Sequence, residues 1–268
     1  MPERAAGGQV LLVDAGNDEI VFGVLAHDEL RHHVRVATDP ARTADEYGAQ
    51  LLPLLDRLGL EPRRTEAFFA ASVVPSLRST FEALAADYFG CRAQFVEAGV
   101  RTGLRIRTDH PAELGADRLV NAVAARAAYG APVLVVDLGT ATTFDVVDAA
   151  GDFVGGVIAP GLDISAQALF SHASKLSPVH LERPRELIGR NTVASMQSGI
   201  FYGYLALVDG IVERLIGEVE GLEEVVATGR AAGLIAAASR HIRHVDERLT
   251  LVGLRMVYEH NRRGGRRR

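Results

Sequence analysis

The sequence contains a single cysteine, Cys91. One cysteine excludes an intrachain disulfide, and such low cysteine usage fits a reducing compartment. No apolar run reaches the roughly 18 residues that a membrane-spanning helix needs. The N-terminal stretch MPERAAGGQ also lacks the apolar core of a secretory signal peptide. We therefore expect a cytoplasmic protein with no membrane partner.

The chain also lacks an excess of positive charge. It has 34 acidic residues against 29 Lys and Arg, with a formal net charge of −5. Because nucleic-acid binding proteins usually carry a basic surface, we expect no nucleic-acid partner. The basic, glycine-containing end of the chain predicts a disordered tail over residues 263–268.

Two common nucleotide-binding loops are missing. The sequence has no GxxxxGK[ST] stretch and no GxGxxG stretch, which argues against a P-loop site and a dinucleotide-binding turn. The nine histidines show no zinc-type spacing with Cys91. No serine has the His–Asp pattern of a hydrolase. A phosphate-binding site must therefore use a different kind of turn.

One local pattern occurs twice along the chain: an apolar strand ends in an aspartate, a glycine-containing turn follows, and a second apolar strand returns. The first copy has Asp14 and Gly16, and the second has Asp137 and Gly139. A chain of 268 residues is long enough for two domains of about 100–200 residues. The repeat predicts two similar α/β halves facing a cleft, one over residues 9–128 and one over 131–262. The alternative is two unrelated hairpins.

Other segments complete this α/β pattern. Apolar spacing predicts helices over residues 40–58, 75–89, 109–129, 163–174, 193–218, 231–239 and 254–261. Short apolar runs predict further strands over 68–74, 95–96, 153–158 and 224–229, the last ending in a Thr-Gly turn.

The residues of the repeated turns suit phosphate binding. Glycine lets the backbone approach closely, and successive N–H groups can then point at phosphate oxygens. Small hydroxyl residues such as Thr140 add further donors. Asp14 and Asp137 stand at the strand ends, where a carboxylate can hold Mg²⁺ or a monovalent cation beside the phosphates.

The predicted helix over residues 109–129 carries a candidate base. Asp117 and Asn121 are four residues apart and share a helix face, while Gly115 leaves that surface open. An acidic residue in such a place can accept the proton of a substrate hydroxyl, and Arg118 can pair with a substrate carboxylate. The alternative is a surface helix with an ordinary Asp–Arg pair.

With these motifs in order, the chain resembles the type III pantothenate kinases over about residues 9–262. The combination of GADR with DLGTATTFD is specific to that family. The matching stretches are DAGND at Asp14, SVVPSL at Ser72, GADRLVNAVAA at Gly115, DLGTATTFDVV at Asp137, GGVIAPGL at Gly155, GRNTVASMQSGIFYGY at Gly189, ATG at Ala227 and LTLVGLRMVYEHN at Leu249.

The resemblance implies an α/β fold of two duplicated ribonuclease H-like domains around a central cleft, as in actin and in acetate and sugar kinases. It implies ATP-dependent phosphorylation of pantothenate to 4′-phosphopantothenate, the first step of coenzyme A biosynthesis. It assigns the ATP-binding residues Asp14, Ala15, Gly16, Asn17, Asp18, Glu19, Ile20, Val21, Gly139 and Thr140.

The resemblance also implies the remaining site. Asp117 is expected to accept the proton of pantothenate, Asp137 to bind a monovalent cation (K⁺ or NH₄⁺), and Asp14 to bind Mg²⁺. The active unit is expected to be a homodimer in which Thr192 reaches the partner's substrate. The substrate-binding residues are Gly115, Ala116, Asp117, Arg118, Thr192 and Thr108.

Three positions depart from the family's site. Asp18 replaces a threonine beside the phosphates, where two like charges about 4 Å apart at an effective dielectric near 20 repel by roughly 4 kcal/mol. Thr108 replaces a tyrosine, and Arg230 replaces a glycine where it could block the nucleotide or bind its phosphates. These departures leave two alternatives to a working pantothenate kinase: a kinase for another small alcohol, and a non-catalytic relative.

Overall fold

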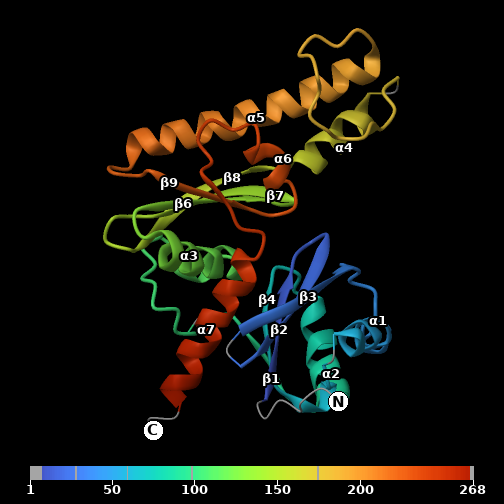
Figure 1. Ribbon diagram of the computed structural model, residues 1–268, viewed down its shortest axis with the longest axis vertical. Coiled ribbons are helices and arrows are strands. Elements are labelled where there is room, and N and C mark those ends of the chain that lie inside the picture. The colour runs from blue at the N-terminus through green and yellow to red at the C-terminus, as the bar shows by residue number, and fades with distance from the viewer. Residues whose placement is uncertain (1–7, 28, 59, 98, 174, 266–268) are drawn as a thin grey trace. The chain divides into compact units, whose positions relative to one another are not determined.

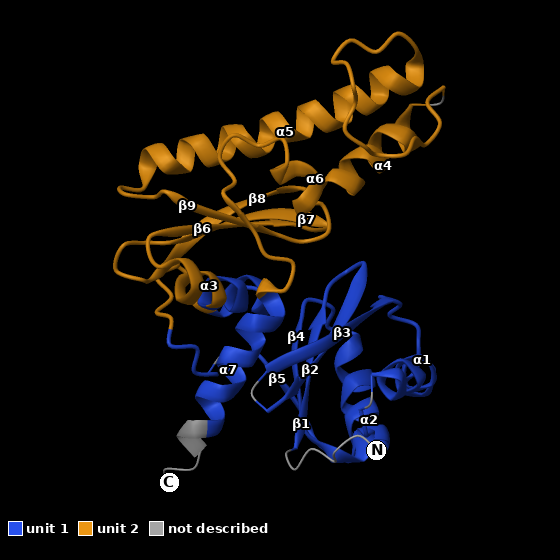
Figure 2. Cartoon of the chain, in the orientation of Figure 1, with its two compact units in different colours: residues 1–103, 112–123, 250–268 blue, residues 104–111, 124–249 orange. Residues whose placement is uncertain are grey.

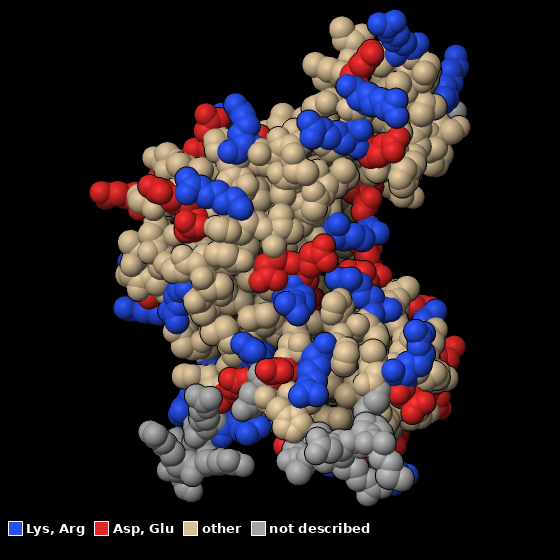
Figure 3. Space-filling model, viewed as in Figure 1, with Lys and Arg blue, Asp and Glu red and all other residues tan. Residues whose placement is uncertain are grey.

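The computed structural model describes residues 8–27, 29–58, 60–97, 99–173 and 175–265. The chain forms two compact units (Figure 2). Unit 1 takes its described residues from segments 1–103, 112–123 and 250–268, and unit 2 is built from 104–111 and 124–249. Basic and acidic side chains are interspersed on the face shown in Figure 3.

Unit 1 contains a five-stranded sheet in the order β3-β2-β1-β4-β5 (Figure 1). Its central strand β1 pairs antiparallel with β2 and parallel with β4, so that Asp14 lies opposite Val21 and Ala71. The strands are β1 (Gln9–Ala15), β2 (Glu19–Ala26), β3 (Glu29–Ala37), β4 (Thr65–Ser72) and β5 (Ala93–Phe95).

Helices cover both faces of this sheet. Side chains of β2 and β4 such as Phe22 and Phe68 pack on Phe81 of α2, with ring centroids 6.5 and 5.8 Å apart. Because successive strand residues point to opposite faces, the next residue, Phe69, contacts Tyr258 of α7 instead, at 5.6 Å. The helices of unit 1 are α1 (Ala44–Arg57), α2 (Leu77–Phe89), α7 (Leu249–Gly265) and the start of α3 (Ala116–Tyr129), with short 3₁₀ turns η1 (Pro62–Arg64) and η2 (Pro111–Glu113) before β4 and α3.

Unit 2 repeats the same sheet plan, in the order β10-β9-β6-β7-β8. Here β6 pairs antiparallel with β7 and parallel with β9, and Asp137 lies opposite Thr143 and Thr228. The strands are β6 (Val133–Leu138), β7 (Ala141–Val147), β8 (Phe153–Pro160), β9 (Glu224–Thr228) and β10 (His244–Val245). The predicted duplication of an α/β half is confirmed.

The helices of unit 2 are α4 (Leu162–His172), α5 (Thr192–Glu218) and α6 (Ala232–Ala236), together with the end of α3. They pack on a buried core that includes Phe144, Val208 and Ile235. Helix α4 ends at His172, and residue 174 of the predicted helix lies outside the described residues. Helix α7 begins before the predicted residue 254 and continues to Gly265, so residues 263–265 of the expected tail are helical and 266–268 are not described. Within the part of the chain that the structure describes, no helix has the length and apolar character to cross a membrane.

Candidate active site

The segment that follows β3 forms hydrogen bonds that stabilise the turn between β1 and β2. Gly16 N donates to Glu19 O at 3.0 Å and closes the turn. Thr38 then makes two bonds to it: its Oγ1 donates to Gly16 O at 2.7 Å, and its N donates to Asp18 O at 3.0 Å. The side chains of Asn17 and Asp18 are exposed at the tip.

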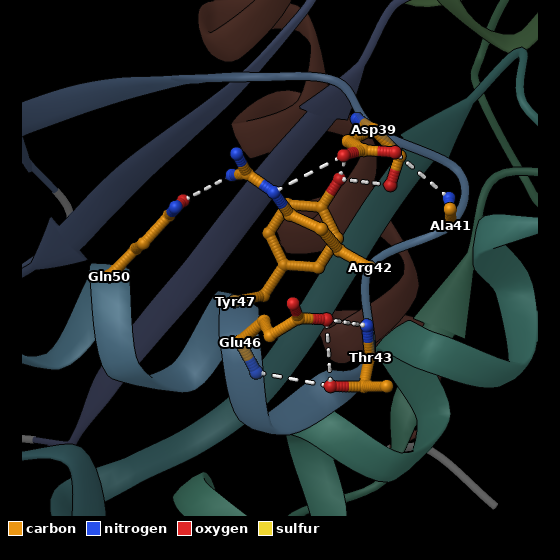
Figure 4. A network of polar contacts seen from close by, with 7 residues as sticks. All are labelled: Asp39, Ala41, Arg42, Thr43, Glu46, Tyr47 and Gln50. Carbon is orange, nitrogen blue, oxygen red and sulfur yellow. Dashed lines mark hydrogen bonds and ion pairs between the residues drawn. The ribbon is translucent and has the colours of Figure 1, made fainter.

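The support of this turn reaches into the core of unit 1 (Figure 4). The ring of Tyr47 is 1% exposed, and its hydroxyl both donates to Asp39 O and accepts from Asp39 N, each at 2.9 Å. Arg42 packs its guanidinium between Asp39, at 3.5 Å, and Gln50, at 2.6 Å. Thr38 therefore directly precedes Asp39, whose backbone is hydrogen-bonded to the buried Tyr47.

Helix α3 presents Asp117 in its first turn. Gly115 leaves room for the carboxylate, since a Cβ at that position would lie 2.5 Å from Asp117 Oδ1. Oδ1 is buried and has no hydrogen-bond partner among the described residues. Burial raises the pKa of the Asp117 carboxyl, and the backbone N–H and the charge of Arg118 partly oppose this rise. A buried carboxylate with an unused oxygen and a raised pKa has the properties of a general base.

The other face of α3 is packed. Leu119, Val120 and Val123 are all buried. Asn121 is 1% exposed, which the sequence did not indicate for an amide one turn from Asp117. Gly253 of α7 lies so close to Val120 O that a Cβ there would overlap it. This contact fixes the helix that carries Asp117 within unit 1.

In unit 2, two glycine turns enclose the carboxylate of Asp137. A Cβ at Gly139 would lie 3.5 Å from Asp137 Oδ1, and a Cβ at Gly229 would lie 2.5 Å from it. Gly229 also has φ +89°, a conformation that favours glycine. The third glycine, Gly161, packs so closely on the carbonyls of Gly139 and Thr140 that it has no room for a Cβ. We call Gly139, Gly161 and Gly229 the glycine cradle.

The cradle is closed by backbone bonds between its turns. Gly161 N donates to Thr140 O and Ala231 N donates to Leu138 O, both at 3.1 Å. A carboxylate at the end of a strand, surrounded by backbone without side chains, is suited to a small cation and to phosphate oxygens. The glycine of the first turn, Gly139, was predicted from the sequence, whereas the packing of Gly161 was not, because the PGL stretch that contains it gives no sign of what lies next to it.

Three further predicted residues lie in unit 2. Thr108 has a buried Oγ1 without a hydrogen-bond partner among the described residues. Thr192 is the first residue of α5, which Asn191 caps by accepting from Ala194 N at 2.9 Å. Thr192 also lines a pocket of about 570 Å³ between α4 and α5, whose other residues include Met196 and Ile200. Arg230 forms an ion pair with Asp163, in the first turn of α4.

The predicted site residues are thus shared between the two units. The turn from Asp14 to Val21 and the stretch from Gly115 to Arg118 belong to unit 1, whereas Thr108, Asp137, Gly139, Thr140 and Thr192 belong to unit 2. Within unit 2 the structure brings Asp137 and Gly139 together. That both sets serve one active site stays a prediction.

The two sheets, whose central strands each carry an aspartate next to their last residue, define a protein of the duplicated ribonuclease H-like class, to which actin and the acetate and sugar kinases belong. Two solved structures share this fold at low sequence identity. A Sinorhizobium meliloti protein assigned as a 2-dehydro-3-deoxygalactonokinase matches with a TM-score of 0.58 and 12% identity, covering 94% of this chain and 96% of its own. The ADPNP-bound activator of the 2-hydroxyisocaproyl-CoA dehydratase from Clostridium difficile matches with a TM-score of 0.53 and 10% identity, covering 98% of both chains.

Within that class, the chain belongs to the type III pantothenate kinase family. The family model, described as type III pantothenate kinase, matches residues 10–214. The type III pantothenate kinase of Geobacter sulfurreducens is 49% identical over 253 residues, covering 94% of this chain and 99% of the relative. That of Brevibacillus brevis is 46% identical over 252 residues, with the same coverage. The predicted family and fold class are confirmed.

Proposed function

We propose that this protein transfers the γ-phosphoryl group of ATP to pantothenate, giving 4′-phosphopantothenate for coenzyme A biosynthesis in the cytoplasm. Membership of the family, with near full-length relatives at 46–49% identity, supports this reaction. The observation that carries the proposal is the carboxylate of Asp117, which has a buried, unbonded Oδ1 facing Gly115.

Asp117 acts as the general base in this proposal. Its carboxylate accepts the proton of the primary alcohol of pantothenate, whose oxygen attacks the γ-phosphorus of ATP while the bond to the β-phosphate oxygen breaks and ADP leaves. A raised pKa makes the carboxylate a better proton acceptor, and burial is its cause. Arg118, the next residue on α3, pairs with the carboxylate of pantothenate.

In this proposal, backbone N–H groups bind the polyphosphate in place of a lysine-containing P-loop. Gly16 in unit 1 and the glycine cradle in unit 2 offer turns without side chains, which allow close approach of phosphate oxygens. Phosphoryl transfer depends mainly on such positioning and on neutralising charge.

Two carboxylates fit cations beside these phosphates. Asp137 lies within the cradle as a site for K⁺ or NH₄⁺, and Asp14, the penultimate residue of β1, is a site for Mg²⁺. Mg²⁺ is commonly bound by one or two carboxylates together with substrate phosphates. When bound, both ions offset charge on the polyphosphate.

We further propose that the active unit is a homodimer, in which a second copy covers the apolar surface of α4, α5 and their connection. Ile164, Leu187, Ile188 and Val193 are exposed there by 43–78%. Ile164 and Val193 are the immediate sequence neighbours of Ser165 and Thr192, which line the same pocket. Such a concentration of exposed apolar side chains is typical of a surface covered in the assembly. In this arrangement Thr192 contacts pantothenate in the partner's site.

The alternative is a non-catalytic or altered-substrate relative, and Asp18 is the observation that favours it. A carboxylate at the tip of the first turn repels phosphate. The side chain of Asp18 is exposed, however, so water and salt screen its charge. This screening supports the catalytic proposal.

The deciding experiment measures ADP release from MgATP in K⁺ buffer, with and without pantothenate, and identifies the product by mass spectrometry. We expect pantothenate-dependent ADP release and a loss of about 10²–10⁴-fold in kcat for Asp117→Asn, with ATP binding retained. A folded wild-type protein that binds ATP but releases no ADP would instead identify the non-catalytic relative. Activity with other small alcohols but not pantothenate would identify the altered substrate.

A further inference from the structure

Arg230 follows directly on a glycine of the cradle. Gly229 packs on Asp137 Oδ1 and on the backbone of Leu138. The side chain of Arg230 then reaches across to Asp163, 67 residues away in the sequence. Both side chains remain open to water, with 59% and 51% of their surfaces exposed.

The partner of Arg230 follows another glycine of the same cradle. Asp163 comes two residues after Gly161, which packs on the carbonyls of Gly139 and Thr140. The ion pair therefore joins the Gly229 turn to the Gly161 turn, and both turns contact the β6–β7 turn. This geometry puts a guanidinium group beside the proposed phosphate-binding backbone.

An anion that binds the guanidinium group more strongly than Asp163 does can displace Asp163 from this ion pair. An exposed ion pair contributes little, because water screens it and two long side chains must be held in one geometry. A guanidinium binds phosphate through two parallel N–H donors, and its planar shape matches the phosphate oxygens better than a point charge does. A nucleotide polyphosphate also carries several negative charges, whereas Asp163 carries one.

We propose that Arg230 is a nucleotide-binding residue that pairs with Asp163 in the free protein and exchanges Asp163 for a phosphate of ATP when the nucleotide enters the cradle. The inference rests on the proposed function, because it requires the nucleotide to bind at the cradle. After the exchange, the exposed carboxylate of Asp163 is solvated by water. Arg230 thereby adds a cationic side chain to a site whose other proposed phosphate contacts come from the backbone and from bound cations.

The experiment compares the binding of MgATP, MgADP and adenosine by isothermal titration calorimetry, at fixed K⁺ and with choline chloride setting the ionic strength. We expect Arg230→Gln to weaken binding of ATP and ADP about tenfold, to leave adenosine unchanged and to reduce the salt dependence of ATP binding. Arg230→Lys should retain part of the affinity. Asp163→Asn should strengthen ATP binding severalfold, because the competing anion is gone.

Arg243→Gln is the matched control. Arg243 also belongs to unit 2 and forms an exposed ion pair, with Glu223 at 3.8 Å, so this variant should bind ATP as the wild type does.

Each outcome separates the inference from the proposed function. A wild-type protein that binds no ATP overturns both. Normal ATP binding by folded Arg230→Gln overturns the inference alone, and tighter binding by that variant shows that Arg230 obstructs the nucleotide. Should glutamine at position 230 impair folding, Asp163→Asn tests the exchange by itself, and unchanged ATP affinity in that variant counts against it.

Discussion

Asp117 combines its proposed role as the proton acceptor with a cost in stability. Its carboxyl lies in a desolvated position, where the charged form is disfavoured, and its Oδ1 has no hydrogen-bond partner within the described chain. The spacing of GADR on a helix indicated the candidate, because a glycine two positions earlier leaves the surface open. The burial of the oxygen could not be predicted, since it depends on segments distant in the sequence.

The raised pKa of Asp117 predicts a stability effect of known sign. Desolvation favours the protonated carboxyl in the folded protein. The contribution of Asp117 to the free energy of unfolding therefore decreases as pH rises from about 4, the pKa of an unfolded aspartate, through the higher pKa of the folded state. Asp117→Asn lacks this titration. We expect its Tm to exceed that of the wild type at neutral pH and the difference to shrink toward about pH 4. Thermal unfolding followed by circular dichroism measures this, and a pH-independent difference would contradict the assignment.

Arg230 illustrates the limit of residue-level sequence reasoning. The sequence shows a long cationic side chain where the family has glycine, and this left blocking and binding as equal interpretations. The structure adds a partner, Asp163, at a separation of 67 residues. Pairings over such distances follow from tertiary packing and leave no signal in local spacing.

Among the elements, strands with uniform apolar runs were predicted well and polar edge strands were not. Strands β1 and β6 are buried at the sheet centre and carry an aspartate as their penultimate residue, so composition alone indicated them. Strand β3, ELRHHVRVA, is largely exposed at a sheet edge. Its charged residues left no apolar run from which a strand could be predicted. Helix α1 begins at Ala44 rather than near residue 40, because Thr43 and Glu46 form a capping box there.

The cradle turn offers a test with an internal control. Gly229→Ala would place a Cβ 2.5 Å from Asp137 Oδ1 at φ +89°, so we expect a loss of about 1–3 kcal/mol in the free energy of unfolding and a weaker K⁺ dependence of activity. Gly233→Ala, four residues later in α6, meets nothing within 4 Å. It should be neutral or stabilising by up to about 1 kcal/mol. Urea unfolding of both variants makes the comparison, and equal effects would argue against a tightly packed cradle.

The β1–β2 turn predicts a positioning role for Thr38. Its hydroxyl is bonded to Gly16 O at 2.7 Å, so Thr38→Val should loosen the turn and raise the KM for ATP severalfold, with a smaller change in kcat. Thr38→Ser keeps the hydroxyl and should restore most of the affinity. Steady-state kinetics with varied ATP tests both variants. A defect in the serine variant as large as that in the valine variant would show that the hydroxyl alone does not position the turn.

For the whole molecule, the sequence repeat predicted two α/β halves, and the structure shows both with the same strand order. Contiguous domains were a simpler expectation than the observed units, which interleave along the chain. Helix α7 comes from the C-terminal end yet packs on β4 of unit 1 through Phe69 and Tyr258. A helix's apolar face shows that it needs a partner, but its sequence position does not show which sheet it covers.

Assembly is the property of the whole molecule that remains to be tested. Ile188 is 78% exposed, an unusual position for a large apolar residue unless a partner covers it. Ile188→Asp should therefore dissociate the proposed homodimer, detected as a halved mass in sedimentation velocity. Because we propose that Thr192 acts in the partner's site, the same variant should raise the KM for pantothenate strongly and change the Kd for ATP little.

The control for this prediction is Val245→Asp, which introduces the same charge at another exposed apolar residue of unit 2, in β10, with 45% of its surface exposed. We expect this variant to remain dimeric and active, since β10 is not part of the proposed interface. If both variants dissociate, the effect of charge is general and does not locate the interface. A wild-type protein that sediments as a monomer at all concentrations, yet phosphorylates pantothenate, would show that Thr192 is not needed across a dimer and that one chain completes the site alone.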